Sequence, residues 1–256
     1  MTSWKKWSAW CESECFAGER ENMVEPIPPA SDSLSQMESL WFPLWHNLFY
    51  LSAYATFTLG CSMRIQGQRN MPTAGPALLI ANHQSYLDPP LVGVAAKRPL
   101  VYLARKTLFR NRFFSGLIRS LNAVPIDQVG VGKEGIRTIL EQLQLGKPVL
   151  VFPEGERTHT GLLQPLKPGI HLLIKRVHAP IVPVGIAGAF DAWPRTRRLP
   201  MPAPLCFPAM PGSISISLGK PVDAAKFSGM PREQVLTELG ELIRIEHERA
   251  ERLRRK

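Results

Sequence analysis

Short apolar runs alternate with helix-like segments through most of the chain, and this alternation constrains the fold more than any other feature. Runs suited to one buried strand each lie at 77–80, 100–104, 123–127, 148–152, 181–186 and 213–218. Between and after them, residues 133–145, a segment opened by Pro168, and residues from Pro231 to the end have apolar residues at helical spacing. The pattern predicts an α/β fold, a largely parallel mixed β-sheet flanked by helices.

The composition limits the class of partner. The chain has 256 residues, enough for one good-sized core, and a formal net charge of +10. Such a charge predicts attraction to phosphorylated ligands, nucleic acid or acidic lipid head groups, and charge alone does not choose among them. The four cysteines are scattered, which predicts free thiols in a reducing compartment and no metal site.

The N-terminal part differs from the rest. Residues 1–36 combine tryptophans with a Pro/Ser-rich stretch, which predicts a loosely ordered extension, and a true start at Met23 or Met37 is an alternative. Residues 39–63 carry no formal charge, and as a helix they would be about 37 Å long. We expect 37–66 to be a helix or helical hairpin that dips into the membrane interface with one side packed on protein, followed by an α/β domain over 67–256. A buried core helix is the alternative.

The segment 81–90 places a histidine and an acid where the first strand ends. His83 precedes Asp88 by five residues, which does not match the spacing of neighbours on a helix face. We expect Pro89 and Pro90 to prevent a helix through them, so that Asp88 returns to His83 through a tight loop. A carboxylate bound to one imidazole nitrogen would leave the other as a base near neutral pH. A structural histidine at a strand-to-loop corner is the alternative.

Polar residues also follow the other strands at their carboxyl ends, where open α/β sheets bind ligands. The turn after the fourth strand offers a glycine for close backbone approach, an arginine fork for phosphate oxygens and a hydroxyl. A solvated charged loop is the alternative for this turn. The residues concerned are Arg105 and Lys106 after the second strand, Asp127 after the third, and Glu154, Gly155, Glu156, Arg157 and Thr158 after the fourth.

A rival pattern follows the third strand. Residues 130–135 match G-x-G-x-x-G, open a helix, and precede Glu154 by about the interval expected of a ribose-binding acid. A nucleotide-binding oxidoreductase is therefore a minor alternative. Against it, Asp127 and Gln128 separate the strand from the first glycine, and the pattern does not follow the first strand of a βαβ unit. No G-x-S-x-G segment supports a hydrolase serine.

Three blocks of the chain together resemble the glycerophospholipid acyltransferases, the family typified by 1-acyl-sn-glycerol-3-phosphate acyltransferase. The blocks are Asn82-His83 through Asp88-Pro89, residues 152–158 and residues 181–184, in the family's order and spacing, and 104–109 resembles a further block. The similarity extends from about Leu40 to Val222.

The resemblance implies a mechanism and a set of partners. His83 would act as general base on a glycerol hydroxyl and Asp88 would orient it, so that the hydroxyl attacks the thioester of acyl-CoA or acyl-carrier protein without an acyl-enzyme. A substrate-binding group would hold the glycerol phosphate: Glu154, Gly155, Arg157 and Thr158, with Arg105 and Lys106 adding positive charge. The resemblance implies no cofactor besides the acyl-thioester co-substrate and no nucleic-acid partner. It implies attachment to anionic lipids at the cytoplasmic face of the membrane.

One residue departs from the family pattern. Gln128 stands where the family usually has arginine, and a neutral amide cannot supply the charge-assisted bidentate contact of a guanidinium. Lysophosphatidate, converted to phosphatidic acid, is the expected acceptor. A different headgroup, or compensation by Arg105 or Arg157, stays open.

Overall fold

The computed structural model describes residues 32–126, 132–197, 199–203, 210 and 212–255. By its internal contacts the chain divides into a unit from Met1 to Trp41 and a larger unit from Phe42 to Lys256, which contains the sheet. Most of the expected extension over 1–36 lies outside the described residues, as do Asp127, Gln128 and Gly130. The account below concerns the larger unit.

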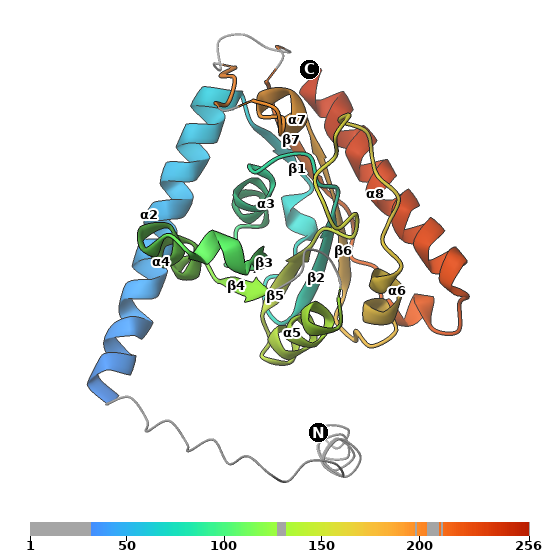
Figure 1. The fold of residues 1–256 in the computed structure, drawn as a ribbon, viewed down its shortest axis with the longest axis horizontal. Helices are drawn as coiled ribbons and strands as arrows, with labels where there is room; N and C mark the ends of the chain where they lie inside the picture. Colours follow the sequence, from blue (N-terminus) through green and yellow to red (C-terminus); the bar gives the residue numbers. More distant parts are fainter. Residues whose placement is uncertain (1–31, 127–131, 198, 204–209, 211, 256) are drawn as a thin grey trace. The chain divides into compact units, whose positions relative to one another are not determined.

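A seven-stranded mixed sheet forms the centre of the described structure (Figure 1). Its order is β1-β7-β6-β2-β5-β3-β4, and the five strands from β6 to β4 are parallel to their neighbours, while β7 is antiparallel to β6 and parallel to β1. The largely parallel mixed sheet is thus confirmed. The strands are β1 Arg64–Gln66, β2 Ala77–Ala81, β3 Val101–Arg105, β4 Ala123–Ile126, β5 Pro148–Val151, β6 Ile181–Ala187 and β7 Ser215–Leu218.

Helices cover both faces of the sheet, so that β2 at its centre is buried on both sides. Leu79 packs into a cluster with α3, while Leu78 and Ile80 pack into a second cluster with α5, α6 and α8. This alternation follows from the two-residue period of a strand. The helices are α2 Asp32–Cys61, α3 Asp88–Ala96, α4 Arg112–Ser120, α5 Lys133–Gln144, α6 Gly169–Ile174, α7 Ala189–Ala192 and α8 Arg232–Arg254, with short 3₁₀ turns η1 Gln68–Asn70, η2 Lys106–Phe109 and η3 Ala224–Phe227.

One expectation about the catalytic segment is wrong. Pro89 and Pro90 do not prevent a helix, because α3 begins at Asp88 and holds both prolines in its first turn. A proline there lacks only an N–H group that has no partner within the helix, and its fixed backbone angle suits the start of a helix. The loop that returns the acid to the histidine therefore ends where α3 begins, at Asp88.

The uncharged N-terminal segment forms one helix, α2, rather than a hairpin. Tyr50, Ala53 and Phe57 on this helix pack against the cluster that contains Leu79, so the expectation of a side packed on protein is confirmed. Among the described residues, no helix is both long and apolar enough to cross a membrane.

Candidate active site

The structure brings His83 and Asp88 into direct contact. His83 lies two residues beyond β2, and its Nδ1 is 2.8 Å from Oδ2 of Asp88, which is fully buried at the start of α3. The same carboxylate oxygen accepts hydrogen bonds from the backbone N–H groups of Gln84 at 2.5 Å and Ser85 at 2.8 Å. The two backbone N–H groups hold the carboxylate of Asp88 in place, and this carboxylate in turn holds the imidazole of His83.

The imidazole ring is held on a second side by the end of β5. Phe152 stacks on the ring of His83 with centroids 4.0 Å apart and planes 16° from parallel. The His83 side chain keeps 18% of its surface exposed. Because Nδ1 donates to Asp88, Nε2 is the unprotonated nitrogen of the neutral ring and is the one that can accept a proton.

Glu154 places a second carboxyl group beside the same histidine. Oε1 of Glu154 accepts the backbone N–H of His83 at 3.3 Å, and the residue is only 2% exposed. Burial, with a smaller contribution from the charge of Asp88, raises the pKa of Glu154 to about 8, although backbone hydrogen bonds from His83 and Gln164 act in the opposite direction. At neutral pH this carboxyl is mostly protonated. Its buried Oε2 has no hydrogen-bond partner among the described residues.

The turn after β5 is joined to the catalytic loop through the backbone. The N–H of Thr158 donates to the carbonyl of His83 at 2.9 Å, and the turn itself relies on Gly155, whose φ of +78° suits glycine. The Thr158 hydroxyl is buried and accepts the N–H of Gly161 at 3.1 Å, so it holds the turn together.

The side chain of Arg157 packs against the loop that carries His83 through a contact with the ring of Tyr86. Its guanidinium carbon is 3.4 Å from the centroid of the Tyr86 ring, and its buried Nη1 has no hydrogen-bond partner among the described residues. The carbonyl of Arg157 accepts a hydrogen bond from Arg195 at 3.2 Å. A cation with an unused donor, held against the loop that carries His83, suits an anionic ligand.

Arg105 and Lys106 lie further along the same edge. β3 neighbours β5, so the ends of β2, β5 and β3 follow one another at the carboxyl edge of the sheet. Arg105 ends β3 and is exposed, and Lys106 opens η2 and forms an ion pair with Glu134 at 3.8 Å. The structure thus places the two residues on the expected edge, with Arg157 one strand away, after β5, and His83 two strands away, after β2.

Sequence reasoning missed the groups that anchor the loop. The side chain of Asn82 exchanges two hydrogen bonds, of 2.9 and 2.8 Å, with the backbone of Ile186 and so extends the pairing of β2 with β6. Gln84 accepts the N–H of Phe190 at 3.4 Å and donates to the carbonyl of Gly161 at 3.3 Å. These partners lie about 75 to 105 residues away in sequence. No local spacing could have indicated them.

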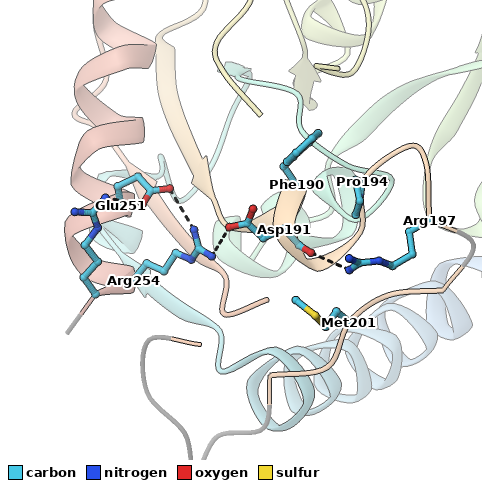
Figure 2. A pocket seen from close by; sticks show the side chains of 8 residues that line it. Phe190, Asp191, Pro194, Arg197, Met201, Glu251 and Arg254 are labelled. Carbon is cyan, nitrogen blue, oxygen red and sulfur yellow. Dashed lines mark hydrogen bonds and ion pairs between the residues drawn. The ribbon is translucent and has the colours of Figure 1, made fainter. Parts of the chain in front are cut away.

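A cavity of about 570 Å³ lies beside this site rather than on it (Figure 2). Arg254 pairs there with Asp191 at 2.5 Å and Glu251 at 3.5 Å, and Arg197 donates to the carbonyl of Asp191. Phe190, whose N–H binds Gln84, forms part of its wall. The cavity is lined by Phe190, Asp191, Pro194, Arg197, Met201, Glu251, Arg254 and Arg255.

The fold and the site together define an acyltransferase. Residues 62–187 match the family model described as Acyltransferase, a stretch that contains His83, Asp88 and the turn from Glu154 to Thr158. This match and the relatives described next support the family of 1-acyl-sn-glycerol-3-phosphate acyltransferases for this chain.

Named relatives and a solved structure agree with this assignment. The chain is 25% identical over 182 residues to a 1-acyl-sn-glycerol-3-phosphate acyltransferase of Bacillus subtilis, covering 71% of this chain and 84% of that protein. It is 31% identical over 161 residues to an enzyme of the same name from Limnanthes douglasii, covering 59% of this chain and 54% of the relative. The crystal structure of the 1-acyl-sn-glycerophosphate (LPA) acyltransferase PlsC from Thermotoga maritima shares the fold, with a TM-score of 0.69, 22% identity and coverage of 89% and 85%.

The dinucleotide-binding alternative lacks support in the fold. β4, the strand before the glycine-rich segment, is at the edge of the sheet, whereas the strand that precedes this motif in a dinucleotide-binding fold is central. Gly132 caps α5 in an extended conformation, and Gly130 lies outside the described residues.

Proposed function

We propose that the protein moves a fatty acyl group from the thioester of acyl-CoA or acyl-carrier protein to the free hydroxyl of 1-acyl-sn-glycerol-3-phosphate, forming phosphatidic acid. The observation that carries this proposal is the 2.8 Å contact between Nδ1 of His83 and Oδ2 of Asp88, beside the turn that bears Arg157. The enzyme acts on lipids at the cytoplasmic face of a membrane.

The reaction follows from the tautomer that Asp88 imposes. Nε2 of His83 takes the proton from the acceptor hydroxyl while its oxygen attacks the thioester carbonyl carbon. The tetrahedral intermediate then expels the thiolate as the C–S bond breaks, and the imidazolium returns its proton to the sulfur. The imidazolium is stabilised in between by the buried carboxylate of Asp88. No acyl-enzyme forms.

Arg157 and the two cations at the end of β3 bind the phosphate of the acceptor. Arg157 supports this role because it carries a buried donor with no partner among the described residues. Protonated Glu154 donates from Oε2 to an acceptor oxygen at the same place. The guanidinium of Arg157, with that of Arg105 at the end of the neighbouring strand, compensates for Gln128, which lacks a charge.

The first test measures thiol release from acyl-CoA by the purified protein in the presence of lysophosphatidate. We expect His83→Ala to lower the rate by about 10²–10⁴-fold, the usual effect of losing a positioned base, with the thermal unfolding midpoint little changed. His178→Ala is the matched control, since His178 is an exposed histidine that precedes β6 at the opposite end of the strands. A His83→Ala variant that keeps nearly full transfer would refute the base assignment.

A panel of acceptors and donors tests the substrates. Lysophosphatidate should be acylated faster than lysophosphatidylcholine and monoacylglycerol, and acyl-CoA and acyl-carrier protein are compared as donors at equal chain length. Preference for an acceptor without a terminal phosphate monoester would replace lysophosphatidate with another headgroup. That outcome would leave His83 as the base.

A further inference from the structure

The cavity shown in Figure 2, called here the α7–α8 cavity, has the size and lining of a small-molecule site. Its volume of about 570 Å³ lies within the range usual for ligand pockets, about 300–1,000 Å³. Phe190, Pro194 and Met201 are half-buried and give the cavity an apolar wall. An aromatic ring in such a wall can stack on a flat heterocycle.

Three arginines give the α7–α8 cavity its charge. Arg197, Arg254 and Arg255 line it together with two carboxylates, Asp191 and Glu251. Positive charges in the lining therefore outnumber negative ones by three to two. Arg197 and Arg255 are exposed, so their guanidinium groups can turn to the oxygens of a phosphate and bind them through charge-assisted hydrogen bonds.

The third of these cations, Arg254, is already held in place. Figure 2 shows it between the two carboxylates, with ion pairs of 2.5 Å to Asp191 and 3.5 Å to Glu251. Gly188 lets the arginine approach this closely, because its φ is +82° and a Cβ at this position would lie 2.7 Å from Nε of Arg254. A cation fixed in advance loses less freedom when a ligand binds.

The negative end of α8, which also borders the cavity, is neutralised. The last carbonyl groups of a helix carry partial negative charge and would repel a phosphate. Nη1 of Arg64 donates to the carbonyls of Leu253 and Arg254 at 3.1 and 3.3 Å. The end of α8 is therefore compatible with an anionic ligand beside it.

The α7–α8 cavity and the turn that bears Arg157 lie on opposite sides of the catalytic histidine. β2, which precedes His83, pairs with β6 on one side and with β5 on the other, all three in parallel. α7 follows directly after β6, whereas the turn with Arg157 follows β5. Two anionic groups bound at these places would flank His83.

The wall of the cavity is also tied to the loop that carries His83. The N–H of Phe190 donates to the side chain of Gln84 at 3.4 Å, and Oγ of Ser85 donates to the carbonyl of Trp193 at 2.8 Å. Gln84 and Ser85 are the two residues that follow the histidine. The segment from Phe190 to Trp193 therefore leads from the cavity to the catalytic loop.

We infer that the α7–α8 cavity binds the nucleotide part of acyl-CoA, a 3′-phosphorylated adenosine diphosphate, and this inference rests on the proposed function. The adenine packs on the apolar wall, and the phosphates bind Arg197, Arg254 and Arg255. The pantetheine chain then runs past the Phe190–Trp193 segment to His83. The thioester donor thus arrives from the β6 side and the acceptor phosphate from the β5 side, which brings the two reacting groups together at the base.

The acidic surface of a carrier protein fits this place less well. A folded protein surface cannot enter a concave cavity as a nucleotide does. Asp191 and Glu251 would in addition face the carboxylates of such a partner, and juxtaposed like charges oppose association.

Thermal unfolding with adenosine 3′,5′-bisphosphate tests the cavity without any acyl transfer. The bisphosphate should raise the unfolding midpoint of the unaltered protein as its concentration rises. Arg197→Gln combined with Arg255→Gln should weaken its apparent affinity by about 10-fold or more, because two charge-assisted contacts are lost. Both side chains are exposed, so the midpoint without ligand should stay close to that of the unaltered protein.

Steady-state kinetics then connect the cavity to the donor. The same double variant should raise the KM for acyl-CoA by about 10-fold or more and leave the KM for lysophosphatidate within about twofold. An acyl-pantetheine, which lacks the nucleotide, should be used equally by both proteins. Lys175→Gln combined with Arg176→Gln is the matched control, since it removes the same charge from two exposed residues at the other end of β6 and should alter neither KM.

The outcomes separate this inference from the proposed function. If no substrate is acylated but the bisphosphate binds through Arg197 and Arg255, the proposed function fails and the nucleotide site stands. A bisphosphate that does not bind, or that binds the double variant as tightly as the unaltered protein, overturns the inference. A double variant whose KM rises for acyl-carrier protein while the bisphosphate does not bind also overturns it, because the cavity would then receive the surface of a carrier protein.

Discussion

The central strands and the β3–α4–β4 side of the same sheet differ in which side chains they bury. At the end of β2 the polar side chains of Asn82, Ser85 and Asp88 are fully buried, and each has hydrogen-bond partners. Along α4 no residue is buried, and the large side chains are apolar. The centre of the sheet thus fixes polar groups in place, and its side leaves apolar groups uncovered.

The difference follows from the topology. β2 pairs with strands on both sides, so the loop after it can be tied to β5 through Phe152 and to β6 through Asn82. β4 is at the edge, so the helix that leads to it has few neighbours. A general base requires geometry held within about 0.5 Å, and the centre of the sheet provides it. The His83–Asp88 pair therefore lies where the fold holds side chains most firmly.

The largest effect should come from Glu154, where the rigid centre holds a buried carboxyl in its neutral form. Because burial raises its pKa from the ordinary value of 4.5 to about 8, the folded protein keeps the proton that the unfolded chain loses. Stability from this group is therefore complete below about pH 4.5 and falls as the pH rises toward 8, by up to about 1.4 kcal/mol per pH unit. Glu154→Gln keeps the neutral shape and should remove this slope.

Urea unfolding at a series of pH values from 5 to 9 measures the difference between the two proteins. The Gln variant should gain relative stability steadily up to about pH 8 and then level off. Glu156→Gln, a change at a half-exposed carboxyl on the same turn, serves as the control and should run parallel to the unaltered protein. Parallel curves for Glu154→Gln as well would show that Glu154 is ionised in the folded state.

A smaller effect is expected from Arg157, the residue proposed to bind the phosphate of the acceptor. Arg157→Ala should raise the KM for lysophosphatidate by about 100-fold, since a charge-assisted bidentate contact contributes about 3 kcal/mol, and leave the KM for acyl-CoA within about twofold. Arg157→Lys should recover only part of the loss, because an ammonium lacks the planar fork. Arg176→Ala removes an exposed arginine beyond α6 and is the control. An acceptor KM unchanged by Arg157→Ala would assign the phosphate to another cation.

The sequence predicts the centre of the molecule well because its signals are local. Continuous apolar runs fit only buried strands, and β2, β5 and β6 lie within a residue of the expected bounds. The sequence also predicts the contact of His83 with Asp88, because the two residues are only five positions apart. The start of α3 differs from the prediction, because a proline pair predicts a break, whereas helices tolerate proline in the first turn.

The remaining features could not be predicted, since they depend on distant neighbours. The pKa of Glu154 reflects burial that the whole sheet produces, and the contacts of Asn82 with Ile186 span 104 residues. α4 was missed for the opposite reason, because helix prediction relies on a face that packs on the core. A helix with no buried residue lacks that signal, and its apolar stripe is interpretable only once its exposure is known.

The smallest effect is expected for Phe113→Ser on α4, and Leu79→Ala in the centre of the sheet is its comparison. Leu79, fully buried in β2, should cost about 2–5 kcal/mol of unfolding free energy when changed to Ala. Phe113→Ser should change the unfolding free energy in detergent-free buffer by less than about 0.5 kcal/mol, because the ring loses almost no protein contact. Urea titration of both variants measures this difference. A loss for Phe113→Ser comparable to that of Leu79→Ala would mean that α4 is part of the folded core.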